Sequence, residues 1–466
     1  LLSNTTGCYN TATGCGALYS NTEGCFNTAY GCGALYSNTT ANDNTGIGEC
    51  SLYSNLSGAD NIMIGKHAGK ITNAHNNIGI GTNALGCNTV GYHNVALGRC
   101  ALWKNTSGTV NTAVGGAALQ NVTTGGYNVA VGNIAAQKHT GNNFVALGFG
   151  AGACNTSASG NVAVGSSASF CNVTGVENTA VGLQALYKNT ASVNTAVGSC
   201  ALVCNTTGGC NTAMGYYAMY KNCSGNFNIG IGPLALCANA SGCYNTAIGY
   251  SASRLHTTGC NNTSYGYQTL YSNTIGSDNV AIGMMTLYGS VTASGNTAVG
   301  SGALKCNTTG ANNVGIGYYA GFYGTEGSSN VAIGRCALVT SLSGDSNVAI
   351  GTEAMCSNWS GCNNIAIGCK ALEDWTGRNN KEGAVAIGTC ALASITTAIG
   401  NTAVGYEAAM STTNGDNTAI GYCALRDNTG GEGNVAIGYC ASKAGTGARH
   451  NVGIGFRALD SSTTCG

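Results

Sequence analysis

One glycine recurs along the whole 466-residue chain, and this repeat constrains the fold more than any other feature. It occurs 27 times, from Gly14 and Gly31 to Gly455. Four of the spacings are 16 residues, the one between Gly368 and Gly388 is 20, and the others are 17. So short a repeat cannot bury a core alone and must stack on its neighbours, which predicts a solenoid. We call this residue the register glycine and count positions from it.

The repeat has the consensus Asn-Thr-Ala-Val-Gly-x-x-Ala-Leu-Tyr-x-Asn-Thr-Thr-Gly-x-x, in which two short apolar segments are separated by corners rich in glycine and asparagine. A helical repeat is excluded because each glycine would cost about 1 kcal/mol relative to alanine. We predict an all-β solenoid, a β-roll or β-helix, of about 27 coils with two short strands per coil. It should form a single continuous array over residues 1–466, with a loop insertion at 378–383. Both chain ends fall inside repeats, so we expect a section of a longer array.

The alternation of side chains along a strand predicts which columns face the core. Positions −3 and −1 carry Thr, Val or Ile and then Val, Ile, Leu or Met, as in Val129 and Val131. We expect these two columns to form the core, and the Ala or Gly column at −2 to point the opposite way. In the second segment Ala101 and Leu102 are adjacent, and so are Ala185 and Leu186. If both residues are extended, at least one apolar column faces outward.

Asparagine fills position −4 in 25 of the 27 repeats, with Phe144 and Ala384 as the exceptions. Stacked side-chain amides hydrogen-bond along the axis of a stack, so this column predicts an asparagine ladder. The ladder begins with Asn10, Asn27, Asn44, Asn61, Asn77, Asn94, Asn111 and Asn128. Tyrosine recurs at position +5, as at Tyr19, Tyr36 and Tyr53, and we expect these rings to pack between coils rather than to bind sugar.

An apolar column that runs along the outside of a solenoid predicts self-association, because patches of that size are unusual on soluble monomers. The partner is then a second copy of this chain, in a homo-oligomer such as a trimer or a helical filament. Charged residues are only 7% of the chain and balance at 17 of each sign, so no basic surface for nucleic acid is expected. No apolar run approaches the roughly 20 residues that span a bilayer, so membrane insertion is not expected.

The segments Asn-Val-Ala-Val-Gly at 128–132 and Asn-Val-Ala-Ile-Gly at 330–334 resemble the head repeats of trimeric autotransporter adhesins. Similar Asn-Thr-Ala-x-Gly repeats occur in phage and giant-virus fibre proteins. The resemblance covers nearly the whole chain. It implies a stiff shaft or an attachment surface without catalytic residues, located outside the cell, at the cell surface or on a virion surface.

The chain has 25 cysteines, which is more than a reduced cytosolic protein usually keeps. Several are 17 residues apart and so share a column in adjacent coils about 4.8 Å apart, within reach of a disulfide. A second set is six residues apart and flanks one corner. The candidate disulfides are Cys8 with Cys25, Cys15 with Cys32, Cys154 with Cys171, Cys243 with Cys260, Cys423 with Cys440, Cys204 with Cys210, and Cys356 with Cys362. The alternative is that these cysteines are small buried hydrophobic residues.

Fourteen Asn-x-Ser/Thr sequons occur, and ten of them share position +7. In a secreted eukaryotic protein they would carry a row of covalent N-linked glycans, which are the only non-protein groups we expect. The alternative is that Asn-Thr-Thr-Gly is good corner chemistry. The candidate glycosylation sites are Asn38, Asn55, Asn105, Asn155, Asn172, Asn205, Asn222, Asn239, Asn307 and Asn358.

No catalytic site, metal site or cofactor is expected, because the six histidines fall at scattered positions of the repeat and the aspartates are isolated. We therefore predict a structural subunit of an extracellular fibre or filament. The alternatives are an adhesin-like shaft or viral attachment fibre that binds a host or cell-surface glycan or receptor, and an ice-binding solenoid. Ice binding is the weakest of these, because threonine fills position −3 in only 12 repeats and this column is expected to be buried.

Overall fold

The computed structural model describes residues 1–374, 383–395, 399–444, 447 and 449–460. In this part of the chain the predicted fold is confirmed as an all-β parallel solenoid without helices. The chain divides into two compact units, residues 1–228 and 229–466. That the two units form one continuous array stays a prediction. Of the predicted loop insertion at 378–383, only Gly383 belongs to the described residues.

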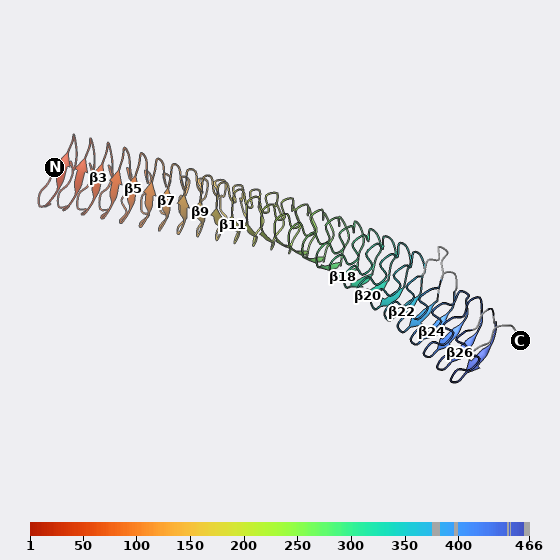
Figure 1. Cartoon of the computed structure of the whole chain (residues 1–466). Coiled ribbons are helices and arrows are strands. Elements are labelled where there is room, and N and C mark those ends of the chain that lie inside the picture. Colours follow the sequence, from red (N-terminus) through yellow and green to blue (C-terminus); the bar gives the residue numbers. More distant parts are fainter. Residues whose placement is uncertain (375–382, 396–398, 445–446, 448, 461–466) are drawn as a thin grey trace. The chain divides into compact units, whose positions relative to one another are not determined.

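Each coil contributes one strand of three residues, which ends immediately before the register glycine (Figure 1). The strands of the first unit are β1 (Thr11–Thr13), β2 (Thr28–Tyr30), β3 (Thr45–Ile47), β4 (Ile62–Ile64), β5 (Ile78–Ile80), β6 (Val95–Leu97), β7 (Thr112–Val114), β8 (Val129–Val131), β9 (Val145–Leu147), β10 (Val162–Val164), β11 (Thr179–Val181), β12 (Thr195–Val197) and β13 (Thr212–Met214).

The second unit has the same construction in its described residues. Its strands are β14 (Ile229–Ile231), β15 (Thr246–Ile248), β16 (Thr263–Tyr265), β17 (Val280–Ile282), β18 (Thr297–Val299), β19 (Val314–Ile316), β20 (Val331–Ile333), β21 (Val348–Ile350), β22 (Ile365–Ile367), β23 (Val385–Ile387), β24 (Thr402–Val404), β25 (Thr418–Ile420), β26 (Val435–Ile437) and β27 (Val452–Ile454).

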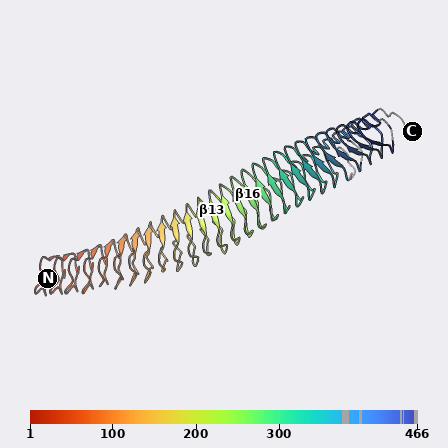
Figure 2. The same cartoon turned by 90° about the horizontal axis from the view of Figure 1, so that it is seen from below.

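Within each unit, neighbouring strands pair in parallel and in register (Figure 2). Thr112, Ala113 and Val114 lie beside Val129, Ala130 and Val131, so each column stacks on itself. The longer repeat between Gly368 and Gly388 does not disturb this register, because Ala366 still pairs with Ala386.

The prediction of the core columns is wrong. The middle residue of the strand, at position −2, is buried, as Ala113 and Ala130 are, whereas positions −3 and −1 face outward. The coil is too narrow to hold two branched side chains, because leucine already fills it from the opposite wall. At Gly46, for example, a Cβ atom would lie 3.3 Å from Cγ of Leu35. Only alanine or glycine fits opposite leucine in most coils.

The predicted second strand is also wrong. The segment after the register glycine folds into tight turns, in which positions +2 and +4 have positive φ values, such as 57° at Ala117 and 49° at Leu119. Neighbouring coils still hydrogen-bond here, since Leu119 N–H donates to Ala135 O at 3.0 Å. Because the residues are not extended, Ala118 and Leu119 both point inward.

Large core residues are accommodated by a glycine at position +4 in the same coil. Met63 takes the place of the usual alanine, and a Cβ atom on Gly69 would lie 2.8 Å from its Cγ. Phe144 takes the place of the usual asparagine, and its ring occupies the space next to Gly152. The core is thus close-packed coil by coil, and a large residue requires a small one opposite.

The register glycine is required by its backbone. Gly31 has a φ of 135°, a conformation that residues with a Cβ atom rarely adopt. A Cβ atom there would also lie 2.7 Å from the carbonyl carbon of Gly48 in the next coil. Both the conformation and the close stacking of the backbones therefore demand glycine at each turn.

Candidate functional site

The outward face of the parallel sheet presents apolar side chains in most coils of each unit. It consists of positions −3 and −1, and we call it the sheet face. Val131 is 39% exposed and Ile282 is 39% exposed, while Tyr30 and Tyr265 project further. The expectation that the Ala-Leu segment has an outward apolar column is wrong, because Ala118 and Leu119 are both buried; the outward apolar columns lie on the strand instead. Parallel sheets usually have both faces covered, so this surface is unusual for a free chain.

The sheet face also changes the argument about threonine. Ice binding was the weakest candidate because this column was expected to be buried. Position −3 faces outward, so that reason is wrong. Thr179, Thr195 and Thr212 stack in three consecutive coils on this face. Branched apolar residues interrupt the column elsewhere, for example at Val162.

Aromatic rings stack in columns beside the sheet. Tyr19, Tyr36 and Tyr53 at position +5 are stacked with ring centroids 4.9 and 5.0 Å apart, which confirms the predicted packing between coils. A second aromatic column at position +1 was not predicted. It contains Tyr406, Tyr422, Tyr439 and Phe456, with successive centroids 5.1, 5.1 and 5.3 Å apart.

The predicted asparagine ladder at position −4 is present, and we call it the first asparagine column. Asn111 is representative: its Nδ2 donates to Asn94 Oδ1 at 3.1 Å and to Gly125 O at 2.9 Å. Its Oδ1 accepts the backbone N–H of Asn128 at 3.1 Å. The same N–H to Oδ1 bonds join the other predicted members, Asn10, Asn27, Asn44, Asn61, Asn77 and Asn94.

The sequon column at position +7 is a second buried asparagine column. Asn38 Nδ2 donates to Asn21 Oδ1 at 2.8 Å and to Ala41 O at 3.0 Å. The two columns meet at the carbonyl of position +10, because Gly108 O accepts Nδ2 of both Asn94 and Asn105. The asparagines of both columns therefore hydrogen-bond the backbone at the corner of the coil from the inside.

This arrangement corrects the prediction of glycosylation. N-linked glycans attach to Nδ2, the atom that these side chains direct into the protein. Every one of the ten predicted sites is at most 2% exposed, so a sugar would require the side chain to leave the core: Asn38, Asn55, Asn105, Asn155, Asn172, Asn205, Asn222, Asn239, Asn307 and Asn358. The alternative interpretation, corner chemistry, accounts for the column.

The prediction of disulfides is corrected as well. All 24 cysteines in the described part of the chain are thiols, including Cys8, Cys25, Cys15, Cys32, Cys154, Cys171, Cys204, Cys210, Cys243, Cys260, Cys356, Cys362, Cys423 and Cys440. Side chains of one column project in parallel from an in-register stack, whereas a disulfide needs two Cβ atoms that converge. A few of the sulfur atoms accept backbone hydrogen bonds instead, as Cys25 Sγ does from Cys8 N–H at 3.1 Å.

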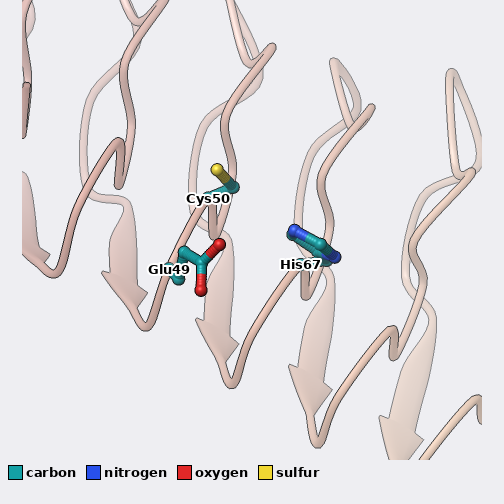
Figure 3. A group of neighbouring side chains, drawn as sticks. All are labelled: Glu49, Cys50 and His67. Carbon is teal, nitrogen blue, oxygen red and sulfur yellow. The ribbon is translucent and has the colours of Figure 1, made fainter.

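A mixed cluster of polar side chains lies at one corner of the first unit. Glu49, Cys50 and His67 each place one potential ligand atom within 4.8 Å of the others. Figure 3 shows Glu49 and Cys50 on one coil and His67 on the next, with the carboxylate turned toward the imidazole ring. The sequence analysis missed this cluster, although Cys50 and His67 are 17 residues apart and so share position +2.

Two further histidines occupy the second asparagine column. His256 Nε2 lies 2.7 Å from Gly259 O, and His256 Nδ1 lies 3.3 Å from Asn273 Nδ2, so the ring replaces an asparagine amide. His139 Nδ1 lies 3.2 Å from Asn155 Oδ1. Burial lowers the pKa of both, that of His139 to about 4, although their hydrogen bonds act in the opposite direction.

Comparison with models of known protein families and with curated proteins found no match to this chain. Among the described residues there is no helical segment with the length and apolar character needed to cross a bilayer. Arguments about function therefore rest on the surfaces and side-chain columns described above.

Proposed function

We propose that this chain is a structural subunit of a fibre that assembles from copies of itself through the sheet face. The observation that carries the proposal is the outward face of the parallel sheet, where branched apolar side chains repeat in most coils and stay partly exposed within their own unit among the described residues. The sheet face of a second copy would cover these side chains, because the side chains of both faces repeat at the same spacing along the stack.

The in-register stacking supports this role mechanically. Each coil is joined to the next by strand hydrogen bonds, by turn hydrogen bonds and by the asparagine columns. Bonds of this kind resist separation of the coils and leave one face free for lateral contacts. A location outside the cell or on a virion rests on the resemblance of the repeat alone, since neither disulfides nor glycans support it.

The proposal is tested by placing charges on the sheet face of the full chain. The variant Val114→Lys, Val131→Glu and Leu147→Lys alternates the signs of the charges, so that neighbouring coils do not repel. Sedimentation velocity over a wide concentration range should show association of the unmodified chain and a single-chain species for the variant. Far-UV circular dichroism should be the same for both, because these side chains point to solvent.

A matched control carries the same charges at an exposed corner of nearby coils. Val110→Lys, Tyr127→Glu and Asn143→Lys lie at position −5, away from the sheet face. This control should associate as the unmodified chain does. If the unmodified chain stays a single-chain species at every concentration, or if both variants associate equally, the sheet face is not an assembly surface.

Ice binding is a second candidate, and the outward threonine column favours it. Thr179, Thr195 and Thr212 present hydroxyl groups at the regular spacing of the sheet. A difference between the melting and freezing temperatures of a solution of the chain, abolished by Thr195→Lys, would support this candidate. No such difference would leave the fibre as the only function proposed.

A further inference from the structure

The corner that contains Glu49, Cys50 and His67 brings together three different ligand types. A thiol, an imidazole and a carboxylate come from two consecutive coils, with their ligand atoms within 4.8 Å of one another (Figure 3). Glu49 is exposed, and Cys50 and His67 are partly exposed, so a solute can reach all three.

The backbone fixes the spacing of these side chains. His67 N–H donates to Glu49 O at 2.9 Å, and Cys50 N–H donates to Cys32 O at 2.9 Å. Cys50 and His67 also have the same left-handed conformation, with φ values of 53° and 59°. The two residues therefore project from equivalent positions of adjacent coils, and the corner does not need to refold to bring their side chains together.

We propose that Glu49, Cys50 and His67 form a binding site for one divalent transition-metal ion of the zinc type. Zn²⁺ accepts thiolate, imidazole and carboxylate ligands at about 2.0–2.3 Å, which places tetrahedral ligands roughly 3.5 Å apart. Ligand atoms within 4.8 Å reach that spacing by small rotations of exposed side chains. The fourth position stays open to water.

Further thiols lie beside the site. A Cβ atom on Gly33 would lie 3.5 Å from Cys50 Sγ, so this sulfur extends toward the preceding coil. Partial desolvation and then the neighbouring thiols of Cys15 and Cys50 raise the pKa of Cys32. The surroundings are thus rich in sulfur, which favours a borderline or soft metal over Ca²⁺ or Mg²⁺.

Lys66 is the group that opposes metal binding. Its Nζ lies 2.9 Å from Glu49 Oε2, and both side chains are about half exposed. The hydrogen bond from Lys66, and to a smaller extent the charge of His67, lower the pKa of Glu49 and keep it ionised. Such an exposed pair is weak, so a metal ion displaces the ammonium group, but its positive charge reduces the affinity. Removing it should strengthen binding.

Another coil of the same unit provides a natural control. Cys100 is also at position +2, but it follows Arg99, and the next coil has Ala117 where the site has His67. Cys100 therefore has the same backbone position as Cys50 without the imidazole and carboxylate. A metal that bound to any thiol of this column would respond to the loss of either cysteine.

The experiment is a titration of the full, reduced chain with Co²⁺, followed by displacement with Zn²⁺. We expect visible ligand-field bands of a tetrahedral site with thiolate charge transfer. Cys50→Ser and His67→Asn should each weaken binding at least about tenfold, as expected for loss of ligands. Cys100→Ser should leave it unchanged, and Lys66→Ala should tighten it. Asparagine is chosen at His67 because it tolerates a positive φ.

A second readout separates this site from scattered binding to other thiols. Because the ligands join two coils, Zn²⁺ should raise the midpoint of thermal unfolding of the unmodified chain but not of His67→Asn. Equal Co²⁺ affinity in the unmodified chain, Cys50→Ser and His67→Asn would overturn the proposal. So would a loss of affinity in Cys100→Ser as large as that in Cys50→Ser.

Discussion

The two asparagine columns run through the same coils, yet they differ in how strictly asparagine is kept. In the first column, at −4, each Oδ1 accepts a backbone N–H of the next coil, as Asn94 does from Asn111 at 3.0 Å. In the second, at +7, Oδ1 accepts either the next side chain, as Asn88 does from Asn105 at 2.9 Å, or a backbone N–H of its own corner, as Asn55 does from Gly58 at 3.1 Å.

This difference in hydrogen bonding explains the difference in tolerance. Losing a side chain from the first column leaves a buried backbone N–H without an acceptor, and no other residue of the coil replaces it. Losing one from the second column removes bonds to the neighbouring side chain and within its own corner, such as those from Asn105 to Asn88 Oδ1 and to Gly108 O. Accordingly the second column also contains Thr72, Val122, His139, His256 and Ser290, all of them buried. The tolerance of each position thus depends on whether the backbone N–H of the next coil relies on its side chain.

The largest expected effect separates the columns directly. Asn111→Ala should destabilise its coils by about 3–5 kcal/mol, because it removes two donated bonds and leaves Asn128 N–H unpaired. Asn105→Ala should cost about 1–2 kcal/mol, since its Oδ1 already has no partner among the described residues. Native-state hydrogen exchange of the amides in these coils measures both. Equal losses would break the comparison.

The next prediction concerns histidine in the second column. The pKa of His139 is lowered to about 4, so the neutral ring stabilises the fold fully above pH 6.5, and this contribution is lost as the pH falls toward 4. We expect a loss of about 2 kcal/mol at pH 5 relative to pH 7. His139→Asn should abolish it, measured as hydrogen exchange of the neighbouring coils at both pH values.

The exposed His93 provides the control for that measurement. His93→Asn should leave the acid sensitivity as it is in the unmodified chain. If His139→Asn is as sensitive to acid as the unmodified chain, the buried ring is not the cause.

A smaller effect is expected from completing the second column. Val122 is buried and follows Asn105, whose Oδ1 it cannot satisfy. Val122→Asn should donate to that oxygen and to Gly125 O, and so stabilise the coils by about 1 kcal/mol after the loss of apolar burial. Denaturant midpoints of the two proteins give the comparison, with Val122→Ala as a destabilised control. A lower midpoint for Val122→Asn than for Val122→Ala would show that the column does not need to be continuous.

The smallest effect tests the residue that precedes the first column. Val110 has a φ of 57°, a conformation that branched residues rarely adopt. Val110→Asn should therefore stabilise the chain by about 0.5–1 kcal/mol, because asparagine tolerates this conformation. The reverse change at the same corner, Asn143→Val, should have the opposite sign in thermal unfolding. The same sign for both would exclude backbone strain as the cause.

The repeat made the coil boundaries, the parallel stacking and the first asparagine column predictable. The register glycine marks each turn, and Asn111 recurs in step with it, so the period alone places both. What the period does not show is which of two alternating faces is inside. Alanine and valine are both apolar, and the choice of Ala113 for the core depends on the leucine of the opposite wall, which is a property of the folded coil.

The candidate sites were harder to predict for related reasons. Asn38 matches a sequon, and only the folded corner shows that its Nδ2 is directed inward. Spacing placed Cys8 and Cys25 in one column, but it says nothing about the direction of their side chains. The cluster of Glu49, Cys50 and His67 could have been found in the sequence, since Cys50 and His67 share position +2 in adjacent coils. It is visible only when individual repeats are compared with one another, because the consensus does not contain these residues.

The direction of the first asparagine column has a consequence for how such chains join. In many coils Nδ2 donates to the asparagine of the preceding coil, as at Asn61, Asn111 and Asn279, so these amide dipoles add along the stack and each unit is electrically polar. A cut between any two coils exposes donors on one side and acceptors on the other. Two such cut faces can restack head to tail, whereas like faces would set donor against donor. A fibre extended by stacking coils would therefore have a single direction, with two ends that are chemically different.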